Sequence, residues 1–134
     1  MSLDSRVGIV LVSHSAGLAQ GAAALAAQIS GGTVAIIPAG GTDDGQLGTS
    51  AAKVRRAVKL ADSGAGVVIL PDLGSAVLTV RALLDEADDL PTPVGLADAP
   101  FVEGVVAATV AASSGADMKT VLAAAEEARH ARKL

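Results

Sequence analysis

Short apolar runs alternate along this chain with longer segments in which apolar residues recur every three to four positions. The runs have the length and composition of strands, and they cover 7–12, 34–37, 67–70 and 94–97. The intervening segments have the spacing of helices, and they cover 16–29, about 50–61, 76–87 and about 100–113. A further helix is expected from Asp117 to about Arg132. Alternating strands and helices predict a three-layer α/β/α fold with a mainly parallel sheet.

Turn and capping residues mark the expected element boundaries. Gly31 and Gly32 end the first helix, and Pro38 ends the second strand. Thr49 or Ser50 is the expected N-cap of the second helix, and Ser75 that of the third. The first helix has an apolar face at helical spacing, formed by Leu18, Ala22, Leu25, Ala26 and Ile29.

Composition narrows the class of protein. The 134 residues are expected to form one domain, 1–134, large enough to bury its own core. The net charge of −4 and the single aromatic residue argue against a nucleic-acid partner. Cysteine is absent, which fits a reducing compartment and a cytoplasmic location. No apolar run has the length of a membrane span, so membrane insertion is not expected.

Candidate chemistry lies at the ends of two strands. His14 follows the first strand and Asp72 follows the third. With the strand order 2-1-3-4, these strands are neighbours, and their carboxyl ends form the crevice where open α/β sheets bind ligands. A carboxylate that accepts the Nδ1–H of an imidazole leaves the Nε2 lone pair facing outward. The pair therefore predicts a histidine that accepts a phosphoryl group.

Several groups near this edge could hold a phosphate. The helix N-termini at Ser15 and Ser75 point unpaired N–H groups toward it, as could the amides of Gly41 and Thr49 in the glycine-rich loop. Without further context, a lone histidine is more often structural than catalytic, and Asp72 could be only a turn residue. His130 lies in a charged C-terminal segment and is expected to be solvated. A hydrolase triad using Ser13 or Ser15 is disfavoured because the Gly-x-Ser-x-Gly pattern is absent.

Five motifs in order resemble one bacterial family over about 7–128. They are VSHSAGLAQG, the GG-D-G-LGTSA loop, PDLGSA, APFVEG and ASSGAD. Together they resemble the mannose-family IIA domain of the phosphotransferase system (PTS), and most of all the version found in DhaM, the phosphotransferase subunit family of dihydroxyacetone kinase. The resemblance covers essentially the whole chain.

The resemblance implies a function and its partners. His14 would be the phosphohistidine, charged by the carrier protein HPr, which enzyme I charges from phosphoenolpyruvate. The recipient would be ADP on the DhaL subunit of a kinase that also contains DhaK, which makes the chain a phosphotransferase subunit. Asp72 falls where the family places the partner of the histidine, and Thr49, Gly74 and Ser75 fall in its active-site turns. The family forms homodimers, and neither a cofactor nor a metal is expected.

Some DhaM proteins continue with HPr-like and enzyme-I-like segments, whereas this sequence ends at Leu134. The phosphoryl group would then come from separate proteins, unless such segments have been removed. Two other functions stay open. A IIA component of a mannose-type sugar transporter would keep the histidine chemistry and change the recipient. A non-catalytic regulatory or ligand-binding module would hold a dissociable small molecule in the crevice and carry no covalent phosphate.

Overall fold

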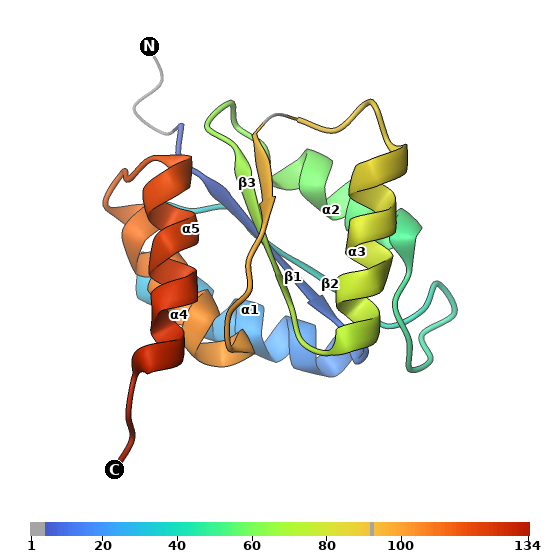
Figure 1. Ribbon diagram of the computed structural model, residues 1–134, viewed down its shortest axis with the longest axis horizontal. Coiled ribbons are helices and arrows are strands. Elements are labelled where there is room, and N and C mark those ends of the chain that lie inside the picture. The colour runs from blue at the N-terminus through green and yellow to red at the C-terminus, as the bar shows by residue number, and fades with distance from the viewer. Residues whose placement is uncertain (1–4, 92) are drawn as a thin grey trace.

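A computed structural model describes residues 5–91 and 93–134 (Figure 1). The elements in chain order are β1 (Gly8–Ser13), α1 (Ala16–Ser30), β2 (Ile36–Gly40), α2 (Ala51–Ala61), β3 (Val67–Pro71), α3 (Gly74–Glu86), β4 (Val94–Leu96), α4 (Phe101–Ser113), α5 (Met118–Glu127) and the 3-10 helix η1 (Ala128–His130). The strands form one parallel sheet in the order β2-β1-β3-β4. The predicted fold class and strand order are therefore confirmed.

Helices cover both faces of the sheet, α2 and α3 on one and α1, α4 and α5 on the other (Figure 1). The central strand β1 divides its side chains between the two resulting cores. Ile9 and Leu11 pack toward α1, α4 and α5, whereas Val10 and Val12 pack toward α2 and α3. All four are fully buried, as expected for a strand covered on both sides. Within the described residues, no helix is long and apolar enough to cross a membrane.

The buried face of α1 differs from the prediction. Its buried apolar residues are all alanines, namely Ala19, Ala22, Ala23 and Ala26. The larger residues Leu18, Leu25 and Ile29 are 41–45% exposed. At Ala19 the cause is the close approach of α1 to β2: a Cβ on Gly40 would lie 2.5 Å from the Ser15 carbonyl oxygen and 2.9 Å from the Ala19 Cβ. Ala22, Ala23 and Ala26 pack into the core that α1 shares with α4 and α5.

The prediction that Pro38 ends the second strand is wrong, because β2 continues to Gly40. Strand β2 lies at the edge of the sheet. The Ile9 N–H donates to the Ala35 carbonyl and the Gly41 N–H to the Ser13 carbonyl, so alternate β2 residues turn their polar backbone groups toward β1. Pro38 falls on the opposite set, which faces outward. Its missing N–H therefore costs no hydrogen bond in the sheet.

Several helix ends agree with the prediction, among them the Asp117 cap of α5 and the ends of α2 at Ala61 and α4 at Ser113. Gly31 ends α1 in the left-handed conformation, with φ of 62°, and the Ser50 hydroxyl caps α2 by accepting the Lys53 N–H at 3.1 Å. Helix α5 stops at Glu127 instead of Arg132. The residues after it are mostly exposed, so no buried face stabilises further helical turns there.

The expected Ser75 cap is also wrong. Helix α3 begins at Gly74, its N-cap residue is Leu73, and no side chain caps it. Ser75 instead lies in the first turn of the helix, and its hydroxyl is free to point elsewhere.

Candidate functional site

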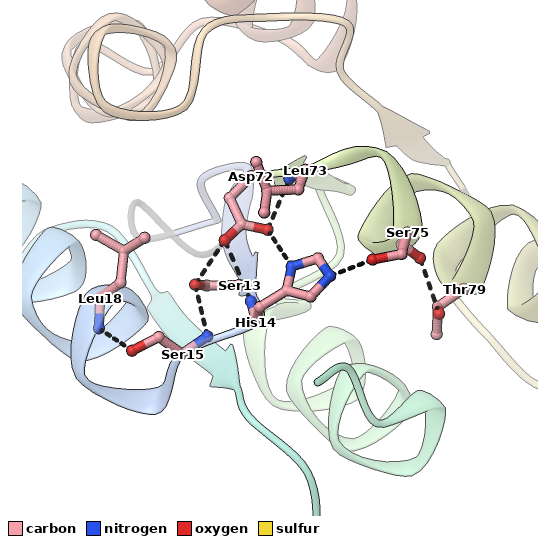
Figure 2. Close-up of polar contacts among 8 residues, drawn as sticks. All are labelled: Ser13, His14, Ser15, Leu18, Asp72, Leu73, Ser75 and Thr79. Atoms are coloured by element: carbon pink, nitrogen blue, oxygen red, sulfur yellow. Dashed lines mark hydrogen bonds and ion pairs between the residues drawn. The ribbon is translucent and has the colours of Figure 1, made fainter. Parts of the chain in front are cut away.

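The site lies where β1 and β3 end side by side at the carboxyl edge of the sheet. His14 follows β1 and Asp72 follows β3, and the parallel pairing of these strands brings the two side chains together (Figure 2). The Nδ1 atom of His14 lies 3.0 Å from Oδ1 of Asp72. The imidazole is 23% exposed and the carboxylate 8%. The structure thus confirms the predicted juxtaposition, with the acid behind the ring and the ring at the surface.

The Asp72 carboxylate is held on both oxygens. Oδ2 accepts hydrogen bonds from the Ser13 hydroxyl at 2.8 Å and from the His14 backbone N–H at 3.1 Å, and Oδ1 accepts the Leu73 N–H at 2.7 Å. Burial raises the pKa of Asp72, but the hydrogen bonds from Ser13, His14 and Leu73 outweigh it and leave the pKa below its usual value. An ionised carboxylate only accepts, so it assigns the ring proton to Nδ1 and the lone pair to Nε2.

The Nε2 atom of His14 faces the first turn of α3. There it contacts the Ser75 hydroxyl, the only side-chain partner of Nε2 in the described part of the chain (Figure 2). The backbone N–H groups of Gly74, Ser75 and Ala76 have no acceptor among the described residues. Three other helices are capped by a side chain: α1 by Ser15, α2 by Ser50 and α5 by Asp117. The helix that faces Nε2 therefore presents unpaired donors.

The glycine-rich loop at 41–50 bonds the backbone carbonyls of Ser13 and His14. The Gly48 N–H donates to the His14 carbonyl at 2.9 Å, and the Gly41 N–H donates to the Ser13 carbonyl at 3.1 Å. Gly41 has φ of 75°, a conformation that favours glycine. The loop amides thus fix the backbone on which His14 sits. Sequence reasoning expected the Gly41 amide to face a phosphate and missed this use of it.

The other predicted phosphate ligands differ in what their polar groups contact. Gly74 and Ser75 lie on the Nε2 side, at the uncapped end of α3. The Ser15 hydroxyl accepts the Leu18 N–H at 3.2 Å and so caps α1. The Thr49 hydroxyl is buried without a hydrogen-bond partner in the described part of the chain. Neither Ser13 nor Ser15 contacts Nε2, so the structure does not form the hydrolase arrangement considered for them.

Two hollows lie beside the residues that flank His14, whose own side chain is in the lining of neither. A hollow of about 290 Å³ lies on the α3 side, with Asp72, Leu73 and Gly74 in its lining. A second hollow of about 550 Å³ lies beside α1 and is lined by Ser15–Gly17 and by the loop at 44–47. The exposed leucines Leu47 and Leu73 stand in the linings of these two hollows, one in each.

Fold and site together define a class of protein: a parallel α/β domain that presents a carboxylate-oriented histidine at the switch point of its sheet. Residues 8–122 match the family model EIIA-man, described as the PTS system fructose IIA component. The chain belongs to this family. The resemblance read from the five motifs is thereby confirmed.

Curated relatives carry a more specific name. The chain is 41% identical over 131 residues to the phosphoryl donor subunit DhaM of the PEP-dependent dihydroxyacetone kinase of Providencia stuartii, and 39% identical over 131 residues to that of Escherichia coli K12. In both cases 95% of this chain is covered but only 28% of the relative. The chain therefore spans little more than a quarter of the length of these relatives.

Two further matches are of similar length to this chain. DhaM of dihydroxyacetone kinase 2 from Listeria innocua is 37% identical over 105 residues, which cover 78% of this chain and 84% of the relative. A crystal structure of a protein of unknown function, EF1359, superposes with a TM-score of 0.81 at 34% identity, over 91% of this chain and 94% of that one. The fold is thus shared with a solved structure that is also related in sequence.

Proposed function

We propose that this chain is a phosphoryl carrier that forms a transient phosphohistidine at Nε2 of His14. The observation that supports it best is the 3.0 Å contact between His14 Nδ1 and Asp72, which leaves the Nε2 lone pair at the surface, facing the uncapped end of α3. Membership of the PTS IIA family and the phosphoryl donor names of the relatives support the same function.

The proposed step is an in-line transfer between two nitrogen atoms. The Nε2 lone pair of His14 attacks the phosphorus atom, the bond between phosphorus and the donor nitrogen breaks, and its electron pair returns to the donor. Nδ1 keeps its proton throughout, and the ionised Asp72 balances the positive charge that the ring acquires. In the second half-reaction an acceptor oxygen attacks the same phosphorus, and His14 returns to its neutral form.

The α3 N-terminus is the proposed binding site for the phosphoryl oxygens. Its N–H groups at Gly74, Ser75 and Ala76 are without acceptors among the described residues, the Ser75 side chain of this turn contacts Nε2, and the helix dipole places positive partial charge at this end. Such a helix end contributes about 0.3 to 1 kcal/mol to an exposed anion and up to about 2 kcal/mol to a partly buried one. The Ser75 hydroxyl occupies the position that phosphorus needs, so it must rotate and can then donate to a phosphoryl oxygen.

The partly exposed imidazole, with a hollow on the Asp72 side and another on the Ser15 side, is compatible with protein partners that carry the phosphoryl group themselves. We propose HPr as the donor, and ADP held on a DhaL-type kinase subunit, with DhaK as its companion, as the acceptor. The family resemblance implies these partners, and the relatives' names, which describe a phosphoryl donor subunit of a PEP-dependent kinase, support a kinase as the recipient. The proposed unit is a homodimer, as the family resemblance implies.

Phosphoryl transfer from phosphoenolpyruvate, enzyme I and HPr tests the proposal. The protein should gain one phosphate that is labile in acid and stable in alkali, and His14→Ala should abolish the label. His130→Ala is the matched control, because His130 is exposed at the C-terminal end and should label normally. Persistent label in His14→Ala would move the site elsewhere. Absence of label in the wild type would favour the non-catalytic ligand-binding module.

A sugar-transporter IIA component is the second candidate, because the description of the matching family names a fructose IIA component. Both candidates share the phosphohistidine and differ only in the recipient. Phosphorylated protein should therefore be offered either to an ADP-loaded DhaL-type subunit or to a IIB component of a mannose-type transporter. Rapid loss of label only to the kinase subunit is the expected result, and rapid loss only to the IIB component would establish the second candidate.

A further inference from the structure

Ser13 is a buried polar residue that precedes the histidine and contacts the acid behind its ring. It is the last residue of β1 and is fully buried. Its hydroxyl donates to Asp72 Oδ2 at 2.8 Å and accepts the Ser15 backbone N–H at 3.0 Å (Figure 2). The Ser15 N–H occupies a lone pair of the hydroxyl, so the single hydroxyl proton is left for the carboxylate. One hydroxyl thus connects the end of β1, the start of α1 and the acid that follows β3.

We infer that Ser13 is a positioning residue: its hydroxyl fixes the Asp72 carboxylate so that Oδ1 faces Nδ1 of His14 and keeps the Nε2 lone pair available. This inference rests on the proposed function, because it concerns the readiness of His14 to accept a phosphoryl group. Ser13 acts through Asp72 and touches neither Nε2 nor the space in front of it.

The two carboxylate oxygens explain why the hydroxyl matters. The terminal torsion of an aspartate is broad, so the carboxylate turns easily unless both oxygens are held. Oδ2 is held by Ser13 and by the His14 backbone N–H, which leaves Oδ1 for Leu73 and the imidazole. Without the Ser13 hydroxyl, Oδ2 keeps a single donor at 3.1 Å and a buried acceptor is left short of partners.

The hydroxyl also favours the charged form of the acid. Among the hydrogen bonds that lower the pKa of Asp72 against its burial, the one from Ser13 has the largest effect. A carboxylate that is less firmly ionised and less firmly oriented is a poorer acceptor for Nδ1–H. The imidazole should then populate the alternative tautomer, with the proton on Nε2, where it blocks attack on phosphorus.

Nitrogen-15 NMR of the His14 ring, recorded at a pH where the ring is neutral, reads the tautomer directly. We expect the wild type to carry its proton on Nδ1 and Ser13→Ala to shift measurably toward the Nε2-protonated form. Ser13→Thr, which keeps the hydroxyl, should resemble the wild type. Ser30→Ala is the matched control: Ser30 is also buried, but it lies at the far end of α1, and its hydroxyl bonds Ala27 and Gly32, away from the site. A change in tautomer in this control would show a merely structural effect.

Single-turnover phosphorylation by phospho-HPr gives the functional consequence. Ser13→Ala should be roughly tenfold slower than the wild type, the value expected for losing one hydrogen bond to a charged group. In an Asp72→Asn background the same substitution should have almost no further effect, since Ser13 acts through the carboxylate. This cycle keeps the inference testable even if the threonine variant folds poorly.

The outcomes separate the two proposals. A wild-type tautomer and rate in Ser13→Ala, or an equal loss in both backgrounds, would overturn the role of Ser13. Absence of any His14 label in the wild type would overturn the proposed function, while the NMR comparison would still report on the carboxylate.

Discussion

The β1–α1 turn and the β3–α3 turn meet at the same edge of the sheet, but their hydrogen bonds are arranged differently. In the first, the Ser13 hydroxyl accepts the Ser15 N–H and the Ser15 hydroxyl accepts the Leu18 N–H, so side chains occupy the start of α1. In the second, Leu73 stands at the N-cap position and offers no acceptor to α3. We call the β1–α1 turn closed, because side chains cap the helix that follows it, and the β3–α3 turn open, because no side chain caps α3.

The difference indicates how the two turns divide the proposed task. The closed turn holds the backbone of His14 still, with the Gly48 N–H on its carbonyl as an additional restraint. The open turn leaves N–H groups at Gly74 to Ala76 for an anion that arrives only with a partner. A missing cap commonly costs a helix about 1 kcal/mol of stability. Among the described residues two α-helices, α3 and α4, begin without a side-chain cap, and of these α3 is the one that contacts Nε2.

Asp72→Asn should have the largest effect, because the Asp72 carboxylate, in the open turn, bonds Ser13 and His14 of the closed turn. An asparagine keeps the shape but can donate its amide protons to Nδ1, which favours the wrong tautomer of His14. We expect phosphorylation by phospho-HPr to slow on the order of 10²-fold, a loss typical of misplaced reacting groups. Stopped labelling reactions would measure it.

Asp117→Asn is the control for this substitution. Asp117 caps α5 by accepting the Thr120 N–H at 2.9 Å and does not touch the site. Its variant should label at the wild-type rate. If Asp72→Asn also labelled within threefold of the wild type, the carboxylate would not be needed to orient the ring.

Leu73→Asp tests the open helix start most directly. Leu73 is 60% exposed, so the substitution removes little packing and places a carboxylate where α3 lacks a cap. Transfer should fall roughly 30-fold, the equivalent of about 2 kcal/mol at a helix N-terminus, whereas the free energy of unfolding should rise because α3 gains a cap. Labelling rates and urea denaturation measure the two effects.

For Leu73→Asp, the expected result is slower transfer together with a higher free energy of unfolding. The matched control is Leu60→Asp, which adds the same charge at an exposed position of α2. An equal loss of transfer in both variants would indicate a general effect of net charge and would remove the special role of α3.

Ser75→Ala should have a smaller effect. The substitution removes the hydroxyl that contacts Nε2 in the free protein and, in our proposal, donates to the phosphoryl group afterwards. Because a hydrogen bond to a charged group contributes about 1.5 kcal/mol at the low end, we expect roughly a tenfold decrease in the lifetime of the phosphohistidine. Loss of label over time in acid-free buffer measures it. An unchanged lifetime would leave the backbone amides as the sole ligands on this side.

Sequence reasoning predicted the part of this site that depends on topology. Apolar runs followed by helical segments give a parallel sheet, and the order β2-β1-β3-β4 places the ends of β1 and β3 together, so the pairing of His14 with Asp72 follows. Its errors concern tertiary context. Pro38 is compatible with a strand because β2 is an edge strand, and α1 buries an alanine at position 19 because Gly40 brings β2 close to it.

The capping errors have a related cause. A serine near the start of a helix predicts a cap, and the rule holds for Ser50 but fails for Ser75, which lies one residue inside α3. Nothing in PDLGSA distinguishes a cap at Ser75 from a helix start at Gly74. The role of Ser13 was equally hidden, because it depends on a contact between residues 59 positions apart in the chain.

Ser15→Ala should have the smallest effect on transfer. It tests whether the closed β1–α1 turn takes any part in binding the phosphoryl group. The hydroxyl of Ser15 caps α1, and its removal should lower the free energy of unfolding by about 1 kcal/mol, as should Ser50→Ala at the start of α2. If the phosphoryl group is bound by α3 alone, both variants should phosphorylate within about twofold of the wild type. Urea denaturation and initial labelling rates decide the point. A large loss of transfer in Ser15→Ala but not in Ser50→Ala would mean that the α1 turn also binds the phosphoryl oxygens, because both variants lose the same kind of cap and only Ser15 is next to His14; the further bond that the Ser50 hydroxyl donates to Asp43 lies in the loop and adds only to the loss of stability.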